Sequence, residues 1–324
     1  MSEGPHDATR TPSGARSITA RIERIADLAS AHRTPAPPLP RSVKIELTAR
    51  CDFQCWFCAS HARPRARSDM PWERYARLAR ELRGLGVEQL GVFYLGESFL
   101  CDWLAEAIRY AKRECSYPYV FLTTNGRLAT AARVRECIAA GLDSLKFAVN
   151  CSGPAQLHEV ARVEPDEFHA IVCNIQDARR VRDEIERESG HRCALYASSL
   201  LIDDLQTNRM APALAEILPY VDQHYWLPLY GKLRKPLPCW PLFKEGHVTW
   251  DGRLSACCLD HALRYDMGNL DATPFAEAWH SPAFRRLREA HLAQDVRGTV
   301  CAECIGYRQP VVPGVDTRHT GART

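Results

Sequence analysis

The chain has 324 residues, of which 46% are hydrophobic and 25% are charged, a composition typical of a globular protein with one large domain or two moderate ones. Its formal net charge is +3, from 42 basic and 39 acidic residues, and no basic run is interleaved with aromatic residues, so nucleic-acid binding is not expected. No apolar run is long enough to span a membrane, and the N-terminus lacks the apolar core of a secretory signal. We therefore expect a cytoplasmic protein without a membrane partner.

Residues 1–41 are predicted to form a flexible N-terminal arm. Four apolar residues at helical spacing, Ile18, Ile22, Ile25 and Leu28, predict one amphipathic helix in this arm. The segment RTPAPPLPRS (33–42) is a proline-rich linker that leads into the first domain.

Apolar segments that predict strands alternate with helical patterns from Ser42 to about Trp226. Strands are expected at 43–47, 89–95, 119–124, 144–150, 194–202 and 221–227. Helices are expected at 71–86, 101–115, 129–141 and 165–186. This order predicts an α/β fold with a parallel sheet, either doubly wound or curled into a full or partial barrel. Active sites of such sheets lie at the carboxyl ends of the strands.

The sequence changes character after Gly231, where we place a domain boundary. The segment 246–258 predicts a hairpin that turns at Asp251-Gly252, and the segment 273–294 predicts one or two helices. These boundaries give a core domain at 42–231, a smaller domain at 232–310 and a tail at 311–324.

Three cysteines directly follow the first predicted strand. In a reducing compartment, the 14 cysteines of the chain indicate metal ligands, catalytic thiols or buried small side chains rather than disulfides. Cys51, Cys55 and Cys58 have the spacing C-x3-C-x2-C, and His61 could complete a structural zinc site. Structural zinc ligands usually come in two pairs on separate turns, so the spacing favours a [4Fe-4S] cluster with three thiolate ligands and one open iron.

This trio, with Phe57 before its last cysteine, resembles the cluster motif of the radical S-adenosylmethionine (SAM) superfamily. The resemblance implies a partial (β/α)6 TIM-like barrel and an open iron that binds the amino and carboxylate groups of SAM. It also implies reductive cleavage of SAM to methionine and a 5'-deoxyadenosyl radical, which abstracts hydrogen from a substrate. A flavodoxin- or ferredoxin-type electron donor is expected as a partner.

Downstream motifs extend the resemblance. YLGESF (94–99) resembles the Gly-Gly-Glu motif that orients the methionine amino group, although Leu95 replaces the first glycine and only Gly96 and Glu97 match. Asn125 and Asn150 close the third and fourth predicted strands, where family members commonly contact the ribose and carboxylate of SAM. Turn formation is an equally good reason for asparagine at these two positions.

A second cysteine set leaves no open position. Cys239, Cys257, Cys301 and Cys304 suit a closed zinc site or a second [4Fe-4S] cluster. Together with the segment 267–288, they resemble the C-terminal auxiliary-cluster domain of radical SAM enzymes. The further cysteines of the full SPASM version do not follow Cys304, so the resemblance implies the shorter "twitch" version with one fully ligated cluster.

Cys258 adjoins this set and has three interpretations, as a buried small side chain, as an alternative ligand, or as a hydrogen-atom donor close to the substrate. The other cysteines are expected in the core, with Cys101 and Cys151 retained as functional candidates because they follow motif loops. This group consists of Cys101, Cys115, Cys137, Cys151, Cys173 and Cys193.

The resemblance implies an enzyme of natural-product biosynthesis. Relatives with a single auxiliary cluster include dehydrogenases that oxidise a secondary alcohol of an aminocyclitol antibiotic precursor, while other relatives epimerise, crosslink or oxidise peptides. About forty residues precede the first strand, too few for the leader-binding domain of many peptide-modifying relatives, so we expect dehydrogenation of a small polar substrate. Peptide modification is the alternative. A non-enzymatic iron–sulfur or zinc redox sensor is a second alternative, which leaves the Gly96-Glu97 motif unexplained.

Overall fold

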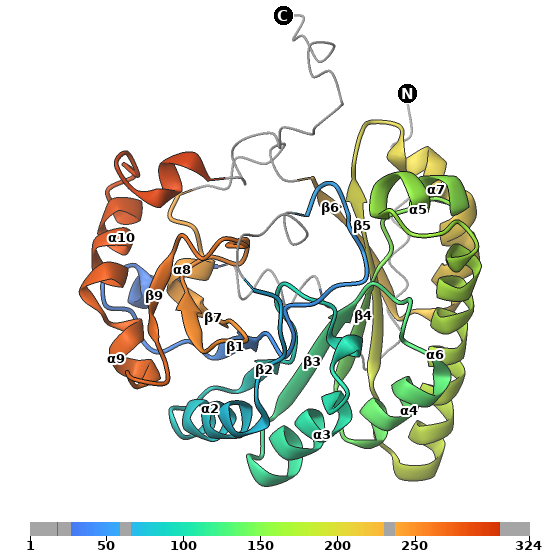
Figure 1. Ribbon diagram of the computed structural model, residues 1–324, viewed down its shortest axis with the longest axis horizontal. Helices are drawn as coiled ribbons and strands as arrows, with labels where there is room; N and C mark the ends of the chain where they lie inside the picture. Colours follow the sequence, from blue (N-terminus) through green and yellow to red (C-terminus); the bar gives the residue numbers. More distant parts are fainter. Residues whose placement is uncertain (1–17, 19–26, 59–65, 230–236, 305–324) are drawn as a thin grey trace, which may run out of the picture.

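The computed structural model describes residues 18, 27–58, 66–229 and 237–304 of the chain (Figure 1). Several predicted features therefore lie outside the described residues, namely most of the N-terminal amphipathic helix, His61, the domain boundary at Gly231 and the tail at 311–324.

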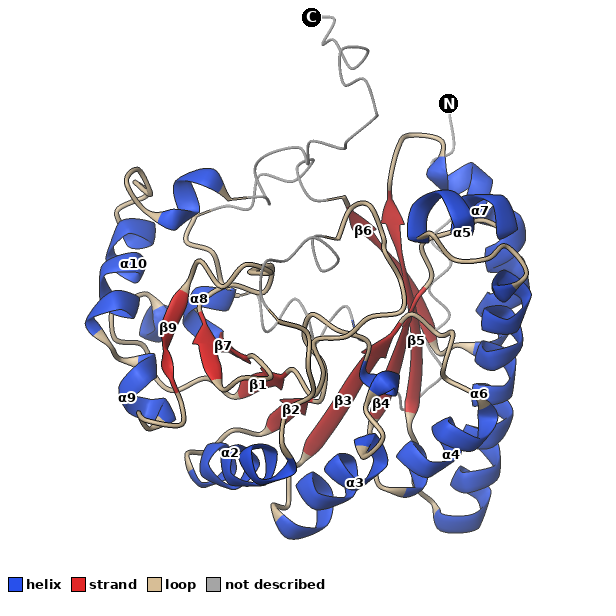
Figure 2. Ribbon diagram, in the orientation of Figure 1, coloured by secondary structure: helices blue, strands red, loops and turns tan. Residues whose placement is uncertain are grey.

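Figure 2 shows a curled, open sheet with helices on its outer face. The strand order is β6-β5-β4-β3-β2-β1-β7-β8-β9, and the first six strands along the chain pair in parallel, each with its neighbour. These strands are β1 (Ser42–Ile45), β2 (Gln89–Gly91), β3 (Tyr119–Thr124), β4 (Ser144–Ala148), β5 (Ala194–Leu201) and β6 (Gln223–Pro228). All six predicted strands are confirmed, and the open parallel sheet is the predicted partial barrel.

Helices connect these strands in the right order for a parallel sheet. They are α2 (Trp72–Gly84), α3 (Leu104–Arg109), α4 (Ala131–Ala139), α5 (Pro154–Ala161), α6 (Glu167–Ser189) and α7 (Gln206–Ile217). The short turns are η1 (Ser30–His32), η3 (Ser98–Leu100), η5 (Leu218–Tyr220), η6 (Val300–Glu303) and one π-helical turn, η4 (Tyr110–Glu114). The sequence analysis missed α5, which is short, and α7, which carries Pro212 in its interior where proline normally opposes a helix.

The C-terminal segment extends the same sheet on the other side of β1. The strand β7 (Glu245–Val248) pairs in parallel with β1, and β8 (Arg253–Ser255) and β9 (Asp266–Asn269) follow in antiparallel order. The predicted hairpin is confirmed as β7 and β8, and Gly252 in its turn has a φ of +79°, which favours glycine.

Three helices cover this part, α8 (Pro241–Lys244), α9 (Phe275–Trp279) and α10 (Pro282–Leu292). Arg288 of α10 is fully buried, with its guanidinium 4.2 Å from the ring centre of Trp279 and 4.3 Å from that of Phe284. It also donates hydrogen bonds to the carbonyls of Leu242 and Trp279, which ties α10 to α8 and α9.

The cysteines predicted for the core are buried, with one exception. Cys101, Cys115, Cys137, Cys151 and Cys193 are buried, whereas Cys173 is exposed, so its placement in the core is wrong. The buried stripe of α6 runs through Ile171, Val172 and Ile175, and Cys173 falls outside that stripe. None of the helices in the described part of the chain is long and apolar enough to cross a membrane.

Candidate active site

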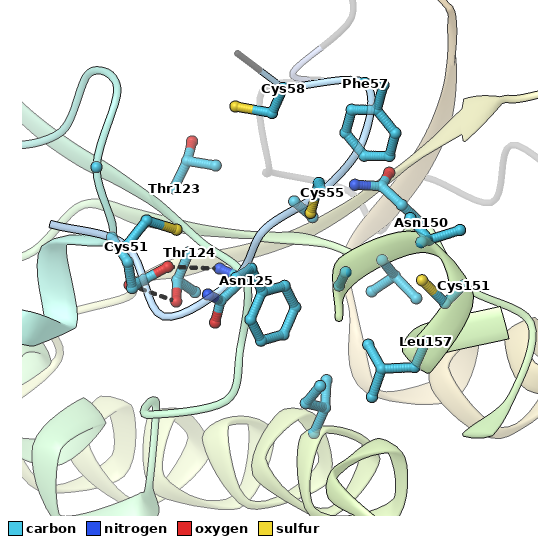
Figure 3. A pocket seen from close by; sticks show the side chains of 18 of the residues that line it. Cys51, Cys55, Phe57, Cys58, Thr123, Thr124, Asn125, Asn150, Cys151 and Leu157 are labelled. Carbon is cyan, nitrogen blue, oxygen red and sulfur yellow. Dashed lines mark hydrogen bonds between the residues drawn. The ribbon is translucent and has the colours of Figure 1, made fainter. Parts of the chain in front are cut away.

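The predicted cysteine trio borders a cavity of about 230 Å³ at the carboxyl ends of the parallel strands. Figure 3 shows Cys51, Cys55 and Cys58 along the loop that follows β1, with Asn150 and Cys151 across the cavity. Backbone hydrogen bonds fix this loop, because the amides of Gln54 and Trp56 donate to the carbonyls of Ala161 and Val160 at the end of α5. The loop therefore presents all three cysteines to one cavity.

The three thiols are not arranged as ligands of a single metal ion. In the described ranges, no three His, Cys, Asp or Glu side chains lie close enough together to ligate one metal ion. An iron–sulfur cluster holds its thiolates on different irons and so accepts a wider separation. Burial raises the pKa of Cys51 to about 12 and that of Cys55 well above its usual value. These thiols therefore need a bound cation to ionise.

Gly96 is the position where the predicted motif touches the cysteine loop. A β carbon at Gly96 would overlap the carbonyl oxygen of Thr48 and stand 2.7 Å from that of Arg50. The next amide, of Glu97, donates to the same Arg50 carbonyl at 2.8 Å. Only glycine permits this close approach of two backbones. The match at Gly96 therefore has a physical reason. The strand β2 itself ends at Gly91, before the predicted end at residue 95.

Glu97 lines the same cavity with a fully buried side chain. Its Oε1 accepts hydrogen bonds from the Phe99 amide at 3.0 Å and from Thr124 Oγ1 at 2.9 Å, and its Oε2 accepts one from the Asn125 amide at 2.8 Å. Burial outweighs these bonds and raises the pKa of Glu97 to about 7. A carboxylate has about four acceptor positions. Glu97 can therefore accept one more donor, as its predicted role toward an amino group requires.

Phe57, Asn125 and Asn150 also line this cavity. The side chain of Asn125 is used within the protein, since Nδ2 donates to Asp52 at 2.7 Å and Oδ1 accepts from the Arg127 amide at 3.0 Å. The Oδ1 of Asn150 accepts a hydrogen bond from the Leu200 amide at 3.1 Å. Asp52, which was not found from the sequence, thus joins the cysteine loop to the end of β3. The contacts of Asn125 and Asn150 with SAM stay predictions.

The second cysteine set converges from three segments. Cys239 precedes α8, Cys257 follows β8, and Cys301 and Cys304 lie in or beside η6, yet all four line one cavity together with Cys258. The amide of Leu259 donates to the Cys257 sulfur at 3.3 Å, a contact that stabilises a thiolate. These four thiols could therefore supply all the protein ligands of one cluster.

The loop around Cys257 is shaped by a buried carboxylate. Asp260 accepts hydrogen bonds from the Ser255 hydroxyl at 3.0 Å and from the amides of Arg264 and Tyr265 at 2.8 Å. Asp260 and its hydrogen-bond donors were not found from the sequence, because these residues follow no recognisable spacing between the cysteines.

A third cavity, of about 360 Å³, is lined by residues of the parallel strands and of the C-terminal segment, and we call it the chamber. It shares Phe93, Tyr94 and Thr123 with the first cavity, and Cys258 and Leu259 with the second. The hydroxyl of Tyr94 donates to the carbonyl of Cys257, so one residue beside the Gly96-Glu97 motif contacts the loop of the second site. The chamber thus adjoins both sites.

Charged side chains from the barrel interior line the chamber. Lys44 Nζ lies 2.9 Å from Glu245 Oε2, which also lies 3.0 Å from Nε2 of His247. Burial alone would raise the pKa of Glu245, but the charge of Lys44 and the contact with His247 lower it to about 2. On β4, burial and the charge of Lys44 lower the pKa of Lys146 to about 8. The sequence analysis missed these residues, although a lysine inside an apolar strand is a signal that could have found them.

Two known domains match the sequence. Residues 45–182 match the radical SAM superfamily, and residues 239–305 match the SPASM iron–sulfur cluster-binding domain. The chain therefore contains a radical SAM domain and a SPASM domain. Each match contains one of the two cysteine sites.

Similar proteins agree with this assignment. The radical SAM chain is 29% identical over 128 residues to a PqqA peptide cyclase of Streptomyces rochei, a match that covers 39% of this chain and 34% of that relative. Among solved structures, it resembles BtrN in complex with AdoMet and 2-DOIA, with a TM-score of 0.54 and 15% identity, covering 78% of this chain and 87% of BtrN. It also resembles Streptococcus suis SuiB bound to its precursor peptide SuiA, with a TM-score of 0.59 and 13% identity, covering 91% of this chain and 79% of SuiB. At these identities the structural likeness concerns the fold.

The two domains define the cofactors. The radical SAM domain binds a [4Fe-4S] cluster and SAM, and the SPASM domain binds an auxiliary iron–sulfur cluster, as predicted. Cys51, Cys55 and Cys58 stay the predicted ligands of the first cluster. The radical SAM match favours a cluster over zinc at this trio.

Proposed function

We propose that this radical SAM protein is an oxidoreductase that dehydrogenates a secondary alcohol of a small polar substrate in natural-product biosynthesis. The position of the chamber carries the proposal, because it shares residues with both cysteine cavities. A substrate held there would meet the SAM site on one side and the auxiliary site on the other.

The cofactors divide the chemistry between these two sides. When bound, the first cluster and SAM would supply a hydrogen-abstracting 5'-deoxyadenosyl radical. The auxiliary cluster would supply an acceptor for the electron that remains after a base has taken the hydroxyl proton. Glu97 would accept a hydrogen bond from the amino group of SAM. Cys239, Cys257, Cys301 and Cys304 would fill the ligand positions of the auxiliary cluster, which suits an electronic role rather than substrate coordination.

The size of the chamber supports a small substrate. Cavities for small molecules usually measure about 300–1,000 Å³. The chamber, at about 360 Å³, falls at the lower end of this range. The structure of BtrN with AdoMet and 2-DOIA, a protein of the same fold, gives a precedent for a small molecule.

Peptide modification is the second candidate, and two comparisons favour it. One relative is named a PqqA peptide cyclase, and SuiB was solved with its precursor peptide. A single side chain of a peptide could enter the chamber. Cys258, which lines the chamber, would then be placed to return a hydrogen atom in an epimerisation.

Product analysis in deuterated water separates these reactions. The holoenzyme is given SAM, reduced flavodoxin and a panel of secondary alcohols and peptides. Dehydrogenation predicts a ketone about two mass units lighter than the substrate, with no solvent deuterium at the abstracted carbon, and Cys258→Ala retaining most of the activity. Deuterium at that carbon without net oxidation, lost in Cys258→Ala, would contradict dehydrogenation and support epimerisation.

A further inference from the structure

Two lysines enter the chamber from the barrel interior. Side chains alternate along a strand, so on β4 Ser144 and Lys146 line the chamber while Ala148, two residues on, lines the first cavity. Lys44 enters from β1 and lies across Gly91, where a β carbon would stand 2.9 Å from Lys44 Cγ. The absence of a side chain at Gly91 thus leaves room for Lys44.

Only Lys44 has a carboxylate partner within the described residues. Its partner is Glu245, at 2.9 Å. Lys146 has an aromatic partner, with Nζ 5.9 Å from the ring centre of Tyr225, and no ion pair with any residue that the structure describes. The other titratable groups on the chamber wall are Tyr94 and Cys258. Since Glu245 is matched by Lys44, the chamber carries one unmatched positive charge when Lys146 is protonated.

An enclosed ammonium group without an anion is unfavourable. Burial and the neighbouring Lys44 lower the pKa of Lys146 to about 8. The lowered pKa means that the charged form of Lys146 is destabilised in the chamber. An anionic group beside Nζ would remove the cost, whereas a cationic group would add to it.

We infer that Lys146 anchors a carboxylate of the substrate, so that the chamber selects an acidic substrate over a cationic aminocyclitol. The inference rests on the proposed function, since it assumes that the chamber holds the substrate. The carboxylate can belong to a hydroxy acid or to an acidic residue of a peptide, because both present the same group to Nζ.

Competitive acetylation tests this inference directly. The chain has six lysines, at 44, 112, 146, 232, 235 and 244, so peptide mass spectrometry can follow each one. Lys112, paired with Asp143 at 2.9 Å outside the chamber, is the internal control. The holoenzyme with SAM, without reductant, is acetylated at constant ionic strength with acetate, glucuronate, glucose, glucosamine, a glutamate-containing peptide or its glutamine counterpart.

The inference predicts that acidic probes slow acetylation of Lys146 by about tenfold or more, which corresponds to a rise of its pKa by about one unit. Glucose and glucosamine should not slow it, and Lys112 should respond to none of the probes. Protection by glucuronate alone would indicate that the carboxylate belongs to a hydroxy acid. Protection by the glutamate peptide alone would indicate that it belongs to a peptide. If no acidic probe protects Lys146 more than Lys112, the inference is wrong.

Substitutions provide a second readout. Lys146→Met should weaken binding of the protecting probe by about tenfold or more, Lys146→Arg should weaken it less, and Lys112→Met should leave it unchanged. Equal weakening by the Met and Arg variants would contradict a charge-based anchor. Iron content and thermal unfolding check that each variant folds. Because no turnover is needed, failure here is distinguishable from failure of the proposed dehydrogenation.

Discussion

The first cysteine site stands on one loop, whereas the second is gathered from segments spread over residues 239–304. Cys51, Cys55 and Cys58 follow β1 directly, and a few backbone hydrogen bonds to the end of α5 hold their loop in place. The second site needs β8, α8, α10 and η6 to pack correctly before its cysteines meet. The first site therefore takes its cysteines from one short segment, and the second takes them from segments that only tertiary packing brings together.

The largest expected effect comes from removing the first site. Changing Cys51, Cys55 and Cys58 to alanine should abolish SAM cleavage and lower the iron content from about eight to about four per chain. Anaerobic iron analysis and 5'-deoxyadenosine release measure both effects. Cys173→Ala is the control, since this cysteine is exposed and lies outside both cavities. Cleavage that persists in the triple variant would contradict the assignment.

The second site should fail through its packing. Arg288→Met leaves the buried carbonyls of Leu242 and Trp279 without their donor, and it should lower the free energy of unfolding by roughly 2–4 kcal/mol. Denaturant unfolding measures this loss. Iron should be lost from the second site and retained at the first. Arg285, also on α10, donates to the His280 carbonyl at an exposed position, so Arg285→Met is the matched control. Equal loss of iron from both sites would show that they are not independent.

A smaller effect is expected from the backbone contact of the first site. Gly96→Ala places a β carbon against the carbonyls of Thr48 and Arg50 and should lower the free energy of unfolding by roughly 1–3 kcal/mol, with weaker SAM binding. Gly84→Ala, where a β carbon meets nothing within 4 Å, should raise stability by roughly 0.5 kcal/mol. Thermal unfolding and equilibrium dialysis of SAM check both variants. If Gly96→Ala changed neither stability nor SAM binding, the claim that this close backbone contact requires glycine would be wrong.

The smallest effect concerns the pH dependence of stability. The pKa of Glu97 is about 7 in the folded protein, against 4.5 for an ordinary glutamate. The folded state therefore binds more protons between these values, and stability should fall as the pH rises through this window. Glu97→Gln should flatten that slope in denaturant unfolding, while Glu73→Gln on α2 should not. An unchanged slope in Glu97→Gln would contradict the assigned pKa.

Local patterns in the sequence were sufficient to predict the parallel sheet and to single out the cysteines that line the two cavities. The spacing of Cys51, Cys55 and Cys58 and the Gly96-Glu97 pair are local patterns, readable without the fold. The six strands follow from apolar runs between helical patterns, and only their ends were displaced. The exposed Cys173 was misplaced because a single position within a long helix needs the exact orientation of its apolar stripe.

The chamber could not be predicted, since its wall is made by strands distant in sequence. Lys44 and Lys146 lie 102 residues apart, and they meet one cavity only because the parallel sheet curls. The pairing of β7 with β1, which brings Glu245 to Lys44, joins two regions that the sequence analysis had treated as separate domains. The role of Tyr94 in joining the two sites was hidden for the same reason.

Electron paramagnetic resonance of the reduced holoenzyme, with and without SAM, tests most directly whether one site is open and the other closed. Two cluster signals are predicted. Addition of SAM should change only the signal that disappears when Cys51, Cys55 and Cys58 are replaced, and it should leave the signal of the second site unchanged. A SAM-dependent change in both signals, or in the second signal alone, would contradict this account.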